Sequence, residues 1–338
     1  MKSERVGVGV IGVGSIGKTH ASNLATRVPG AKLVAVSDVN QAAASEASSR
    51  FGVKAFGDYT ELLEDESVEA VVIATPPLMK KEITVRAADR RKAVFCEKPI
   101  AVSMESADAM VEAVKSSGIT FQVGYQKRFD QSFVAAKQAI DGGEVGRILL
   151  VRANNRDPPS RVGGWTADPR KSGSIFLDTC SHDFDAVRWL TGSEVERVYA
   201  DGSSTMFEEL KASGDYDTVT ITLKLRNGTM AEVDACTYTP YGFDSRAEIV
   251  GTKAGVFIDM GAKDQMRMFR KDSVSFGMHD FYGSRWGQAY LDEMIGFVDA
   301  VSNSAVPRAT VRDGRAAVRI GLAAWDSIKS GAPVRLVD

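Results

Sequence analysis

The sequence predicts an α/β protein of two domains, and a change of pattern along its 338 residues leads to this prediction. From residue 6 to about residue 123, short apolar runs alternate with segments of helical character, which is typical of βαβ units that build a parallel sheet with helices on both faces. Beyond residue 124, long runs of alternating residues indicate an α+β domain with a large, mostly antiparallel open sheet. We therefore expect one domain over residues 1–123 and a second over residues 124–338.

Five strands are expected in the first domain, because five short apolar runs recur between helical segments. These strands cover residues 6–11, 32–38, 70–75, 93–97 and 120–124. Helices are expected to begin at residue 16 and to cover residues 41–51, 59–63, 79–91 and 106–117. Ser103 precedes the last helix, and its hydroxyl can cap a first turn that also carries an acidic side chain.

In the second domain, strands are expected where polar and apolar residues alternate. These runs cover residues 147–154, 218–238, 246–250 and 256–260, and an Asn-Gly pair at 227–228 splits the second run with a two-residue hairpin signal. Helices expected to cover one face of this sheet span residues 182–190, 290–302 and 312–330. We expect the other face to bind a second subunit through apolar positions of one strand. These positions are Val219, Ile221, Leu223 and Leu225.

A glycine-rich turn joins the first expected strand to the first helix. Gly12 permits a tight turn, Gly14 leaves room for a pyrophosphate at the positive end of the helix, and Gly17 lets the helix pack against the strand. Asp38, at the end of the second strand, can accept hydrogen bonds from both hydroxyls of an adenosine ribose and would repel a 2′-phosphate. The pattern therefore predicts a Rossmann domain that binds NAD rather than NADP. The residues expected to contact the cofactor here are Gly12, Gly14, Ser15, Ile16, Gly17 and Asp38.

The composition argues against several classes of partner. The net charge of -2 gives no general basic field for a nucleic acid, and no apolar run approaches the roughly 20 residues that a helix needs to cross a bilayer. The N-terminus passes directly into the first strand, so we expect no signal peptide. The cysteines Cys96, Cys180 and Cys236 are far apart and odd in number, so we expect buried thiols, no disulfide framework and a reducing cytoplasm.

Three further stretches carry residues suited to chemistry. Lys98 lies in an E-K-P motif at the carboxyl end of a strand, where doubly wound sheets bind ligands, although an exposed lysine at a strand end is the plainer interpretation. Asp178 and His182 are four residues apart, so they share a face on a helix, and a structural hydrogen bond is the alternative to a catalytic pair. The polar stretch 154–159 suits either a polyol or an ordinary turn.

Together these motifs resemble the Gfo/Idh/MocA oxidoreductase family over nearly the whole chain, and within it the branch of inositol 2-dehydrogenases. The E-K-P and D-x-x-x-H elements are the most diagnostic of the family, whereas an R-D-P loop and a stretch that contains a tyrosine indicate the inositol branch less specifically. The stretches that carry the resemblance are 12–17 with His20, 74–77, 97–99, 124–130, 156–158, 172–178, 182–185 and 241–244.

The resemblance implies a set of site residues. In that family, residues that match Lys98, Asp178 and His182 form a catalytic triad, which also contacts the substrate. The chain departs from the family at Asp157, which is Asn in some inositol enzymes, and at 179–180, where Thr-Cys replaces a commoner Asp-Met pair. Residues implied near the nicotinamide end of the cofactor are Thr75, Pro76, Glu97 and Lys98, and those implied to line a polyol pocket are Arg128, Asp157 and Tyr241.

The implied reaction oxidises a ring CH–OH of a cyclic polyol, such as myo-inositol or scyllo-inositol, to a ketone, with hydride transfer to NAD. His182 is expected to act as general base, Asp178 to orient it, and Lys98 to stabilise the charge that develops on the reacting oxygen. The family resemblance also suggests a homotetramer built from dimers. No metal is expected, because the histidines at 20, 182 and 279 lack ligand spacing, and we assign His20 and Lys18 to packing or to the edge of the cofactor.

Two other interpretations stay open at this point. An enzyme of the same family could act on a hexose, a pentose or a 1,5-anhydro sugar. A non-catalytic regulator that senses a nucleotide could keep the fold without turnover, although such a protein has no need for the three triad residues together.

Overall fold

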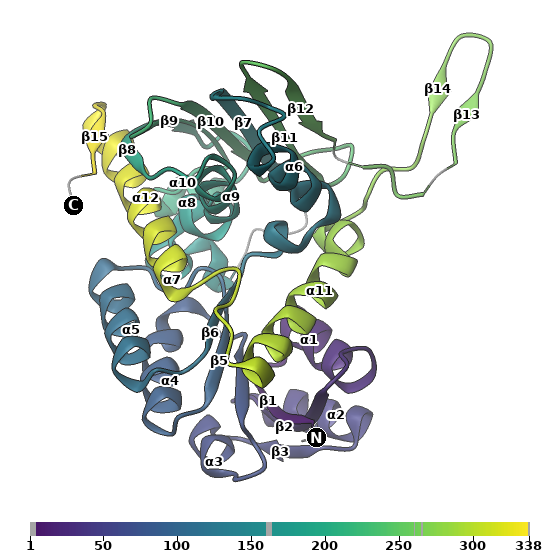
Figure 1. Cartoon of the computed structure of the whole chain (residues 1–338), viewed down its shortest axis with the longest axis vertical. Helices are drawn as coiled ribbons and strands as arrows, with labels where there is room; N and C mark the ends of the chain where they lie inside the picture. The colour runs from purple at the N-terminus through teal and green to yellow at the C-terminus, as the bar shows by residue number, and fades with distance from the viewer. Residues whose placement is uncertain (1–4, 160–163, 260, 265, 337–338) are drawn as a thin grey trace. The chain divides into compact units, whose positions relative to one another are not determined.

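The chain folds into two compact units (Figure 1). The structure is a computed structural model that describes residues 5–159, 164–259, 261–264 and 266–336. The first unit contains Met1–Phe129 and Gln288–Val318, and the second contains Asp130–Gly287 and Arg319–Asp338. These units are defined by structural compactness. The boundary expected between residues 123 and 124, which separates cofactor binding from substrate binding, stays a prediction.

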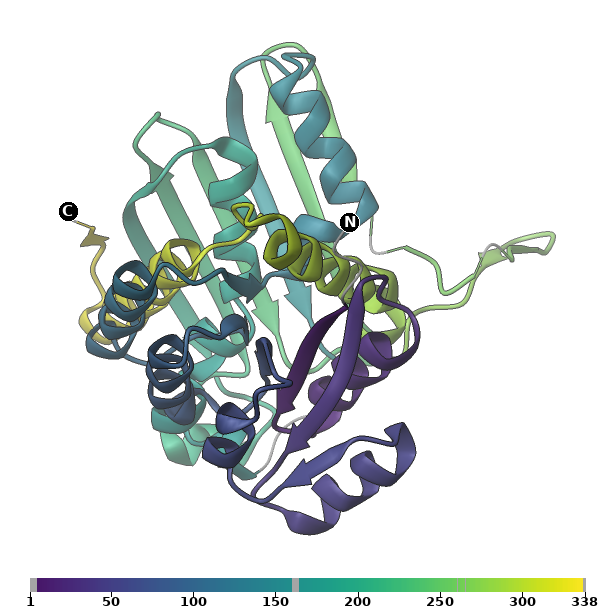
Figure 2. The same ribbon diagram turned by 60° about the horizontal axis from the view of Figure 1, so that its bottom comes forward.

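The first unit is built on a six-stranded parallel sheet (Figures 1 and 2). Its strand order is β3-β2-β1-β4-β5-β6, the order of a doubly wound dinucleotide-binding sheet. The order reverses between β1 and β4, so a crevice for a ligand is expected at the carboxyl ends of these two strands. The strands are β1 (Val6–Ile11), β2 (Ala31–Ser37), β3 (Lys54–Phe56), β4 (Ala70–Ile73), β5 (Ala93–Glu97) and β6 (Phe121–Gly124).

Three of the helices between these strands begin at residues whose side chains cap the first turn. The Ser103 hydroxyl accepts a hydrogen bond from the Ser106 N–H, which confirms the expected cap, and Asn40 and Asp58 cap two other helices in the same way. The helices are α1 (Ser15–Thr26), α2 (Gln41–Phe51), α3 (Tyr59–Glu64), α4 (Pro77–Asp89) and α5 (Met104–Ser117), followed by the 3-10 turn η1 (Gln126–Phe129).

Helix α11 (Tyr282–Asn303) corrects one expectation. The helix expected over residues 290–302 was assigned to the second sheet, but residues 288–318 belong to the first unit. Its apolar side chains Leu291, Met294 and Phe297 join a buried core cluster with Val8 and Phe95. The helical spacing of these residues showed that one face is buried, but that spacing does not say against which sheet.

The second unit contains a seven-stranded sheet with the order β12-β11-β7-β10-β9-β8-β15. Only β7 and β10 pair in parallel among these strands, which confirms the mostly antiparallel sheet. The strands are β7 (Ile148–Arg156), β8 (Val195–Ser203), β9 (Thr218–Leu225), β10 (Met230–Cys236), β11 (Asp244–Gly251), β12 (Gly255–Ile258) and β15 (Val334–Arg335). Its helical segments include α6 (Gln131–Asp141), α7 (Pro169–Ser172), α8 (Ser174–Asp178), α9 (Ser181–Thr191), α10 (Glu208–Ser213) and the later part of α12 (Val311–Ser330), with the 3-10 turn η2 (Gly164–Ala167).

Strand β9 corrects two further details. The hairpin to β10 forms as expected, but Leu225 pairs with Thr229 across a three-residue loop in which only Gly228 has a positive φ, of 87°. The apolar positions from Val219 to Leu225 are each 0% exposed, so they face the chain's own core and not a partner subunit. The period of two places these residues on one face without saying which face the helices cover.

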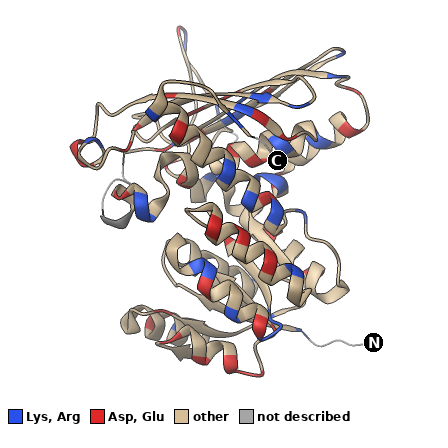
Figure 3. Ribbon diagram, turned by 90° about the vertical axis from the view of Figure 1, so that its left-hand side faces the viewer, with Lys and Arg blue, Asp and Glu red and all other residues tan. Residues whose placement is uncertain are grey.

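A two-stranded hairpin of β13 (Met268–Phe269) and β14 (Val274–Ser275) extends away from the rest of the second unit (Figure 1). This hairpin was not predicted from the sequence. Basic and acidic residues are both spread over the ribbon in Figure 3, in keeping with the small net charge. None of the helices in the described ranges is both long and apolar enough to span a membrane.

Candidate active site

The glycine turn after β1 has the geometry that its sequence predicts. Gly12 has a φ of 89°, and a Cβ on Gly17 would lie 1.9 Å from the Gly12 carbonyl oxygen, so neither position admits a larger residue without rearrangement. A Cβ on Gly14 would meet no described atom within 4 Å, which leaves open space beside the turn. Gly14 is the N-cap of α1 and offers no side chain to the N–H groups of the first turn, where Ser15 and Ile16 lie. This helix start therefore suits a pyrophosphate.

Asp38 follows β2 and also supports the turn, a role that the sequence analysis missed. Its Oδ2 accepts a hydrogen bond of 2.9 Å from the Val13 N–H, and its Oδ1 accepts one of 2.8 Å from the Asn40 N–H. A carboxylate has about four acceptor positions. Both ribose hydroxyls can therefore still be bound by the half-buried Asp38, and the residues fit an NAD adenosine.

The residues expected near the nicotinamide lie at the carboxyl ends of two neighbouring strands of the same sheet. Thr75 and Pro76 follow β4, Glu97 ends β5, and Lys98 comes next in a half-buried position. The Thr75 hydroxyl oxygen is buried and has no hydrogen-bond partner among the described residues. A carboxamide would satisfy this oxygen, so the pattern fits a nicotinamide.

Behind Lys98 lies a buried cluster of His20, Glu97 and Glu293, which the sequence did not predict as a group. The His20 Nε2 lies 2.6 Å from the Glu97 Oε1 and 3.9 Å from the Glu293 Oε1. The His20 ring is 0% exposed and packs edge-on against Phe95 and Tyr290, so it lies in the packed interior of the first unit. By contrast, Lys18 lies at the surface and pairs with Glu46.

The two carboxyl groups of this cluster have opposite pKa shifts. Burial, and then the charge of Glu97, hold the pKa of Glu293 well above its usual range. Burial also acts to raise the pKa of Glu97, but the hydrogen bond from His20 and the positive charges of His20 and Lys80 outweigh it and lower that pKa. Glu97 is therefore the ionised partner and Glu293 the neutral one.

We expect Glu293→Gln to remove the loss of stability that the wild type undergoes as pH rises and Glu293 ionises. Because folding raises the pKa of Glu293, the neutral carboxyl contributes stability fully below the unfolded value of about 4.3, and this contribution is lost as pH rises toward the folded value. Glutamine stays neutral, so the difference in thermal midpoint between the variant and the wild type should widen as pH rises above the unfolded value of about 4.3. Thermal unfolding with Glu105→Gln, an 89% exposed side chain, as control checks this. A difference that stays constant with pH would contradict it.

Lys80 is a second buried group that the sequence analysis missed. Its side chain is 2% exposed, and its ammonium donates to the backbone carbonyls at residues 97–99. A signal was present in the sequence, because Lys80 shares a helical face with Ile83, Thr84 and Ala87, all buried on α4. Such a lysine on an apolar face needs buried acceptors.

In the second unit, Asp178 and His182 lie on two successive helices and not on one. Asp178 ends α8, and His182 is the second residue of α9. Two consecutive residues with positive φ precede Asp178, Gly173 at 83° and Ser174 at 68°. The His182 residue is 7% exposed, and Asp178 is half-buried. The structure therefore keeps both side chains in one short segment, as expected, but with a break at 179–180 that the spacing alone did not reveal.

Ser174 ties this segment to a neighbouring acid. Its hydroxyl donates a 2.6 Å hydrogen bond to Asp215. Burial raises the pKa of Asp215, against the hydrogen bond from Ser174, and the charge of Asp178 raises it further. Asp215 is therefore close enough to Asp178 to sense its charge, and it is a polar neighbour of the expected triad that the sequence analysis did not name.

The remaining expected polyol residues of the second unit lie where β7 ends and β11 begins. Asp157 is 7% exposed, and its carbonyl accepts hydrogen bonds from the Thr239 N–H and hydroxyl, each of 3.0 Å. Tyr241 is 44% exposed and donates a 3.0 Å hydrogen bond to Asp244, which also accepts one of 2.8 Å from Arg246 and lies 3.7 Å from the Arg156 guanidinium. These contacts fix the loop after β10, and the contact of Asp157 and Tyr241 with a polyol stays a prediction.

Arg128 has a structural role in the first unit. It lies in η1, forms a 2.9 Å ion pair with Asp313 and donates to the Arg308 carbonyl. Its side chain is 6% exposed. These contacts tie η1 to residues 308–313, and its expected place in a polyol pocket stays a prediction.

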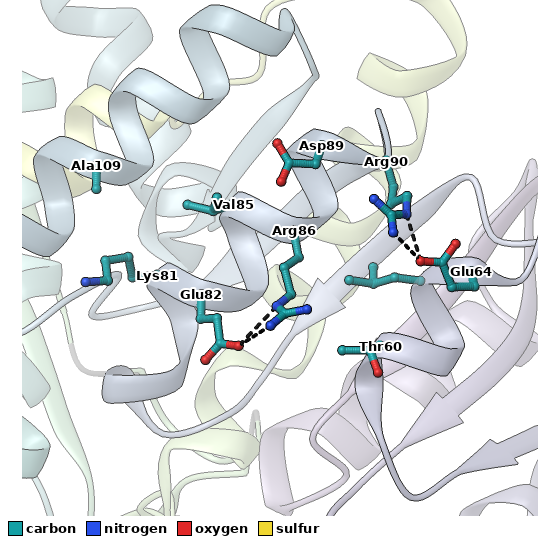
Figure 4. Close-up of a pocket in the computed structure, with 10 residues that line it drawn as sticks. Thr60, Glu64, Lys81, Glu82, Val85, Arg86, Asp89, Arg90 and Ala109 are labelled. Atoms are coloured by element: carbon teal, nitrogen blue, oxygen red, sulfur yellow. Dashed lines mark hydrogen bonds and ion pairs between the residues drawn. The ribbon is translucent and has the colours of Figure 1, made fainter.

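A surface cavity of about 600 Å³ lies among α3, α4 and α5 (Figure 4). Two ion pairs, Glu64 with Arg90 and Glu82 with Arg86, run along it. None of its lining residues is a predicted cofactor or catalytic residue. The candidate cofactor site is therefore defined by the glycine turn and the strand ends and not by this cavity.

Comparisons with known proteins agree with this geometry. Residues 6–125 match the model of the Gfo/Idh/MocA oxidoreductase family with its NAD-binding Rossmann fold, and residues 133–257 match that family's C-terminal domain. The chain is 34% identical to a myo-inositol 2-dehydrogenase of Thermotoga maritima over 97% of its length and 98% of the relative's. It is also 34% identical to the NAD⁺-dependent scyllo-inositol 2-dehydrogenase of Bacillus subtilis, over 97% and 95%.

A solved structure shows the same fold over nearly the whole chain. The scyllo-inositol dehydrogenase of Lactobacillus casei with bound NAD(H) and scyllo-inositol has a TM-score of 0.93 and 29% identity, and covers 98% of this chain and 99% of its own. The sheet order, the glycine turn and these full-length similarities lead to one assignment. The chain belongs to the Gfo/Idh/MocA family of oxidoreductases, and its N-terminal part is that family's NAD-binding Rossmann domain.

Proposed function

We propose that this protein uses NAD to oxidise a ring hydroxyl of a cyclic polyol to a ketone, with myo-inositol or scyllo-inositol as substrate and an inosose as product. The observation that carries the proposal is the full-length similarity to two inositol 2-dehydrogenases, in a chain with the catalytic motif residues Lys98, Asp178 and His182. Lys98 lies at the edge of the sheet where the glycine turn lies, which places a cation near the nicotinamide end of the cofactor site.

The proposed roles follow from the chemistry of each side chain. His182 removes the hydroxyl proton, because imidazole is a suitable base near neutral pH. Asp178 orients the imidazole and stabilises its protonated form, while Lys98 donates a hydrogen bond to the reacting oxygen as negative charge develops. When bound, NAD would supply the acceptor for the hydride of the ring carbon. The carbon thus loses a hydride, the oxygen loses a proton to His182, and the C–O bond becomes a carbonyl.

A panel of polyols tests this proposal against its alternatives. The purified protein is mixed with NAD and, in separate reactions, with myo-inositol, scyllo-inositol, a hexose, a pentose or a 1,5-anhydro sugar, and reduced nicotinamide is followed by absorbance. We expect the highest kcat/KM with an inositol. A higher kcat/KM with one of the sugars would show that this sugar, and not an inositol, is the substrate. A folded protein that binds NAD and oxidises none of these compounds would favour a non-catalytic regulator that senses a nucleotide.

We also propose that the protein is a homotetramer, built as a dimer of dimers. The β13–β14 hairpin supports an assembly, because a two-stranded hairpin is marginal alone and this one exposes Phe269 at 76% and Val274 at 56%. We expect light scattering at micromolar concentration to give four times the monomer mass of 36.4 kDa. A monomeric mass would contradict the proposed tetramer. It would imply that loops of the same chain, and not a second subunit, cover the apolar surface.

The compartment proposed is the cytoplasm. Cys96, Cys180 and Cys236 are all free thiols, and the first two are buried, as expected for a reducing environment. Thiol titration of the protein isolated without reductant should count three thiols after unfolding. A disulfide would contradict this proposal.

A further inference from the structure

The backbone that carries Lys98 is held on one side by the buried Lys80. The Lys80 Nζ lies 2.7 Å from the Glu97 carbonyl oxygen, 3.1 Å from that of Lys98 and 3.0 Å from that of Pro99. An ammonium group has three N–H donors, so these three bonds use its full donor capacity. Burying this charge costs free energy unless such acceptors are fixed in place, and the arrangement therefore defines the path of the chain on both sides of Lys98.

The Glu97 carboxylate holds the same backbone through an independent set of contacts. Its Oε2 accepts a 3.1 Å hydrogen bond from the Lys98 N–H, and its Oε1 lies 2.6 Å from the His20 Nε2. His20 lies on α1, the helix that begins at the glycine turn. The bond between His20 and Glu97 thus links the helix expected to bind the pyrophosphate to the strand end that carries Lys98.

The spacing in the buried cluster of His20, Glu97 and Glu293 is that of a hydrogen bond and not of a metal site. Two ligand atoms of one tetrahedral zinc lie about 3.3 Å apart, given metal–ligand distances of about 2.0–2.1 Å. The distance of 2.6 Å between the His20 and Glu97 atoms is too short for this and normal for a charge-assisted hydrogen bond. The cluster is therefore suited to fixing the position of the Glu97 carboxylate, and with it the backbone at Lys98.

We propose that Lys80 and His20 are positioning residues, which set the place of Lys98 relative to the glycine turn. The inference rests on the proposed function, in which Lys98 contacts the reacting oxygen. Neither residue touches substrate or cofactor in this proposal, since both act through the backbone and carboxylate around Lys98. A catalytic group displaced by about 1 Å can cost a factor of about 10² in rate, so loss of either contact should lower kcat more than it weakens cofactor binding.

Lys80→Met, with Lys81→Met as the matched control, tests the first contact. Lys81 is the next residue of α4, and its side chain is 41% exposed. We expect Lys80→Met to lower kcat about 10–100-fold while KM for NAD changes less than about threefold, and Lys81→Met to match the wild type. A folded Lys80→Met protein with kcat within about twofold of the wild type would overturn the role of Lys80.

A pair of substitutions at His20 tests the second contact. His20→Leu removes the donor to Glu97, whereas His20→Gln keeps an N–H donor of similar reach. We expect His20→Leu to lower kcat about tenfold and His20→Gln to restore part of this loss. A kcat of His20→Leu equal to or above that of His20→Gln would overturn the role of His20, because a purely packing role favours leucine over glutamine at a buried site.

Amide hydrogen exchange separates this inference from the proposed reaction. The peptide that contains Lys98 should exchange about tenfold faster in Lys80→Met than in the wild type or Lys81→Met, since the carbonyls of residues 97–99 have lost their ammonium donor. Unchanged exchange in a folded Lys80→Met protein would overturn the positioning role even if the enzyme is active. If the wild type oxidises no polyol, the proposed function fails, and the exchange measurement still decides whether Lys80 fixes this backbone.

Discussion

Replacing Lys98 or His182 by alanine is expected to lower kcat by about 10²–10⁴-fold, because the loss of a positioned acid–base group typically costs this much. Lys98→Ala removes the donor to the developing charge, and His182→Ala removes the base. Both variants should still bind NAD, since the glycine turn and Asp38 form a separate part of the cofactor site. Steady-state kinetics with an inositol and calorimetric titration with NAD measure the two effects separately.

Two further variants sharpen this test. Asp178→Asn should have a kcat between the wild type and His182→Ala, because it disturbs the orientation of the imidazole and leaves the base in place. Lys81→Ala, at an exposed lysine of α4, should leave kcat unchanged. The proposed chemistry fails if Lys98→Ala or His182→Ala is folded, binds NAD and keeps a kcat near that of the wild type.

Local patterns were enough to predict most of the first unit. The G-x-G-x-x-G motif depends on residues that lie within six positions of one another. Its geometry at Gly12 and Gly17 could therefore be predicted from the sequence. The cap at Ser103 depends on contacts only three residues away. Residues close together in the sequence determine both features, and the structure confirms both.

Contacts between distant residues could not be predicted in this way. His20 and Glu97 are 77 residues apart, and the sequence does not show that Glu293 lies beside them. The helix that carries Glu293 was expected on the second sheet, since its apolar spacing is the same whichever sheet it covers. Lys80 was missed for a different reason, because a buried lysine is rare and its acceptors lie on another strand end.

Replacing Asp38 is expected to weaken the preference for NAD over NADP. The expected change in KM for NAD is nearly as large as the loss of kcat expected for Lys98→Ala. Wild-type protein is expected to prefer NAD over NADP, because the Asp38 carboxylate would lie against a 2′-phosphate. Asp38→Ala removes hydrogen bonds to the ribose, and a bond to a charged group contributes about 1.5–3 kcal/mol. We therefore expect KM for NAD to rise about 10–100-fold and the preference over NADP to narrow, as measured by kcat/KM with each cofactor.

Asp38→Asn separates the two roles that the structure gives this side chain. Asparagine keeps an acceptor for the Val13 N–H, which Asp38 bonds at 2.9 Å, but removes the charge that repels a 2′-phosphate. It should therefore narrow the preference as Asp38→Ala does, with a smaller rise in KM for NAD, because the glycine turn stays supported. Asp58→Asn, at an acid that caps α3, should change neither value. If the wild type uses NADP as well as NAD, Asp38 does not bind the ribose, and its contact with Val13 is its main role.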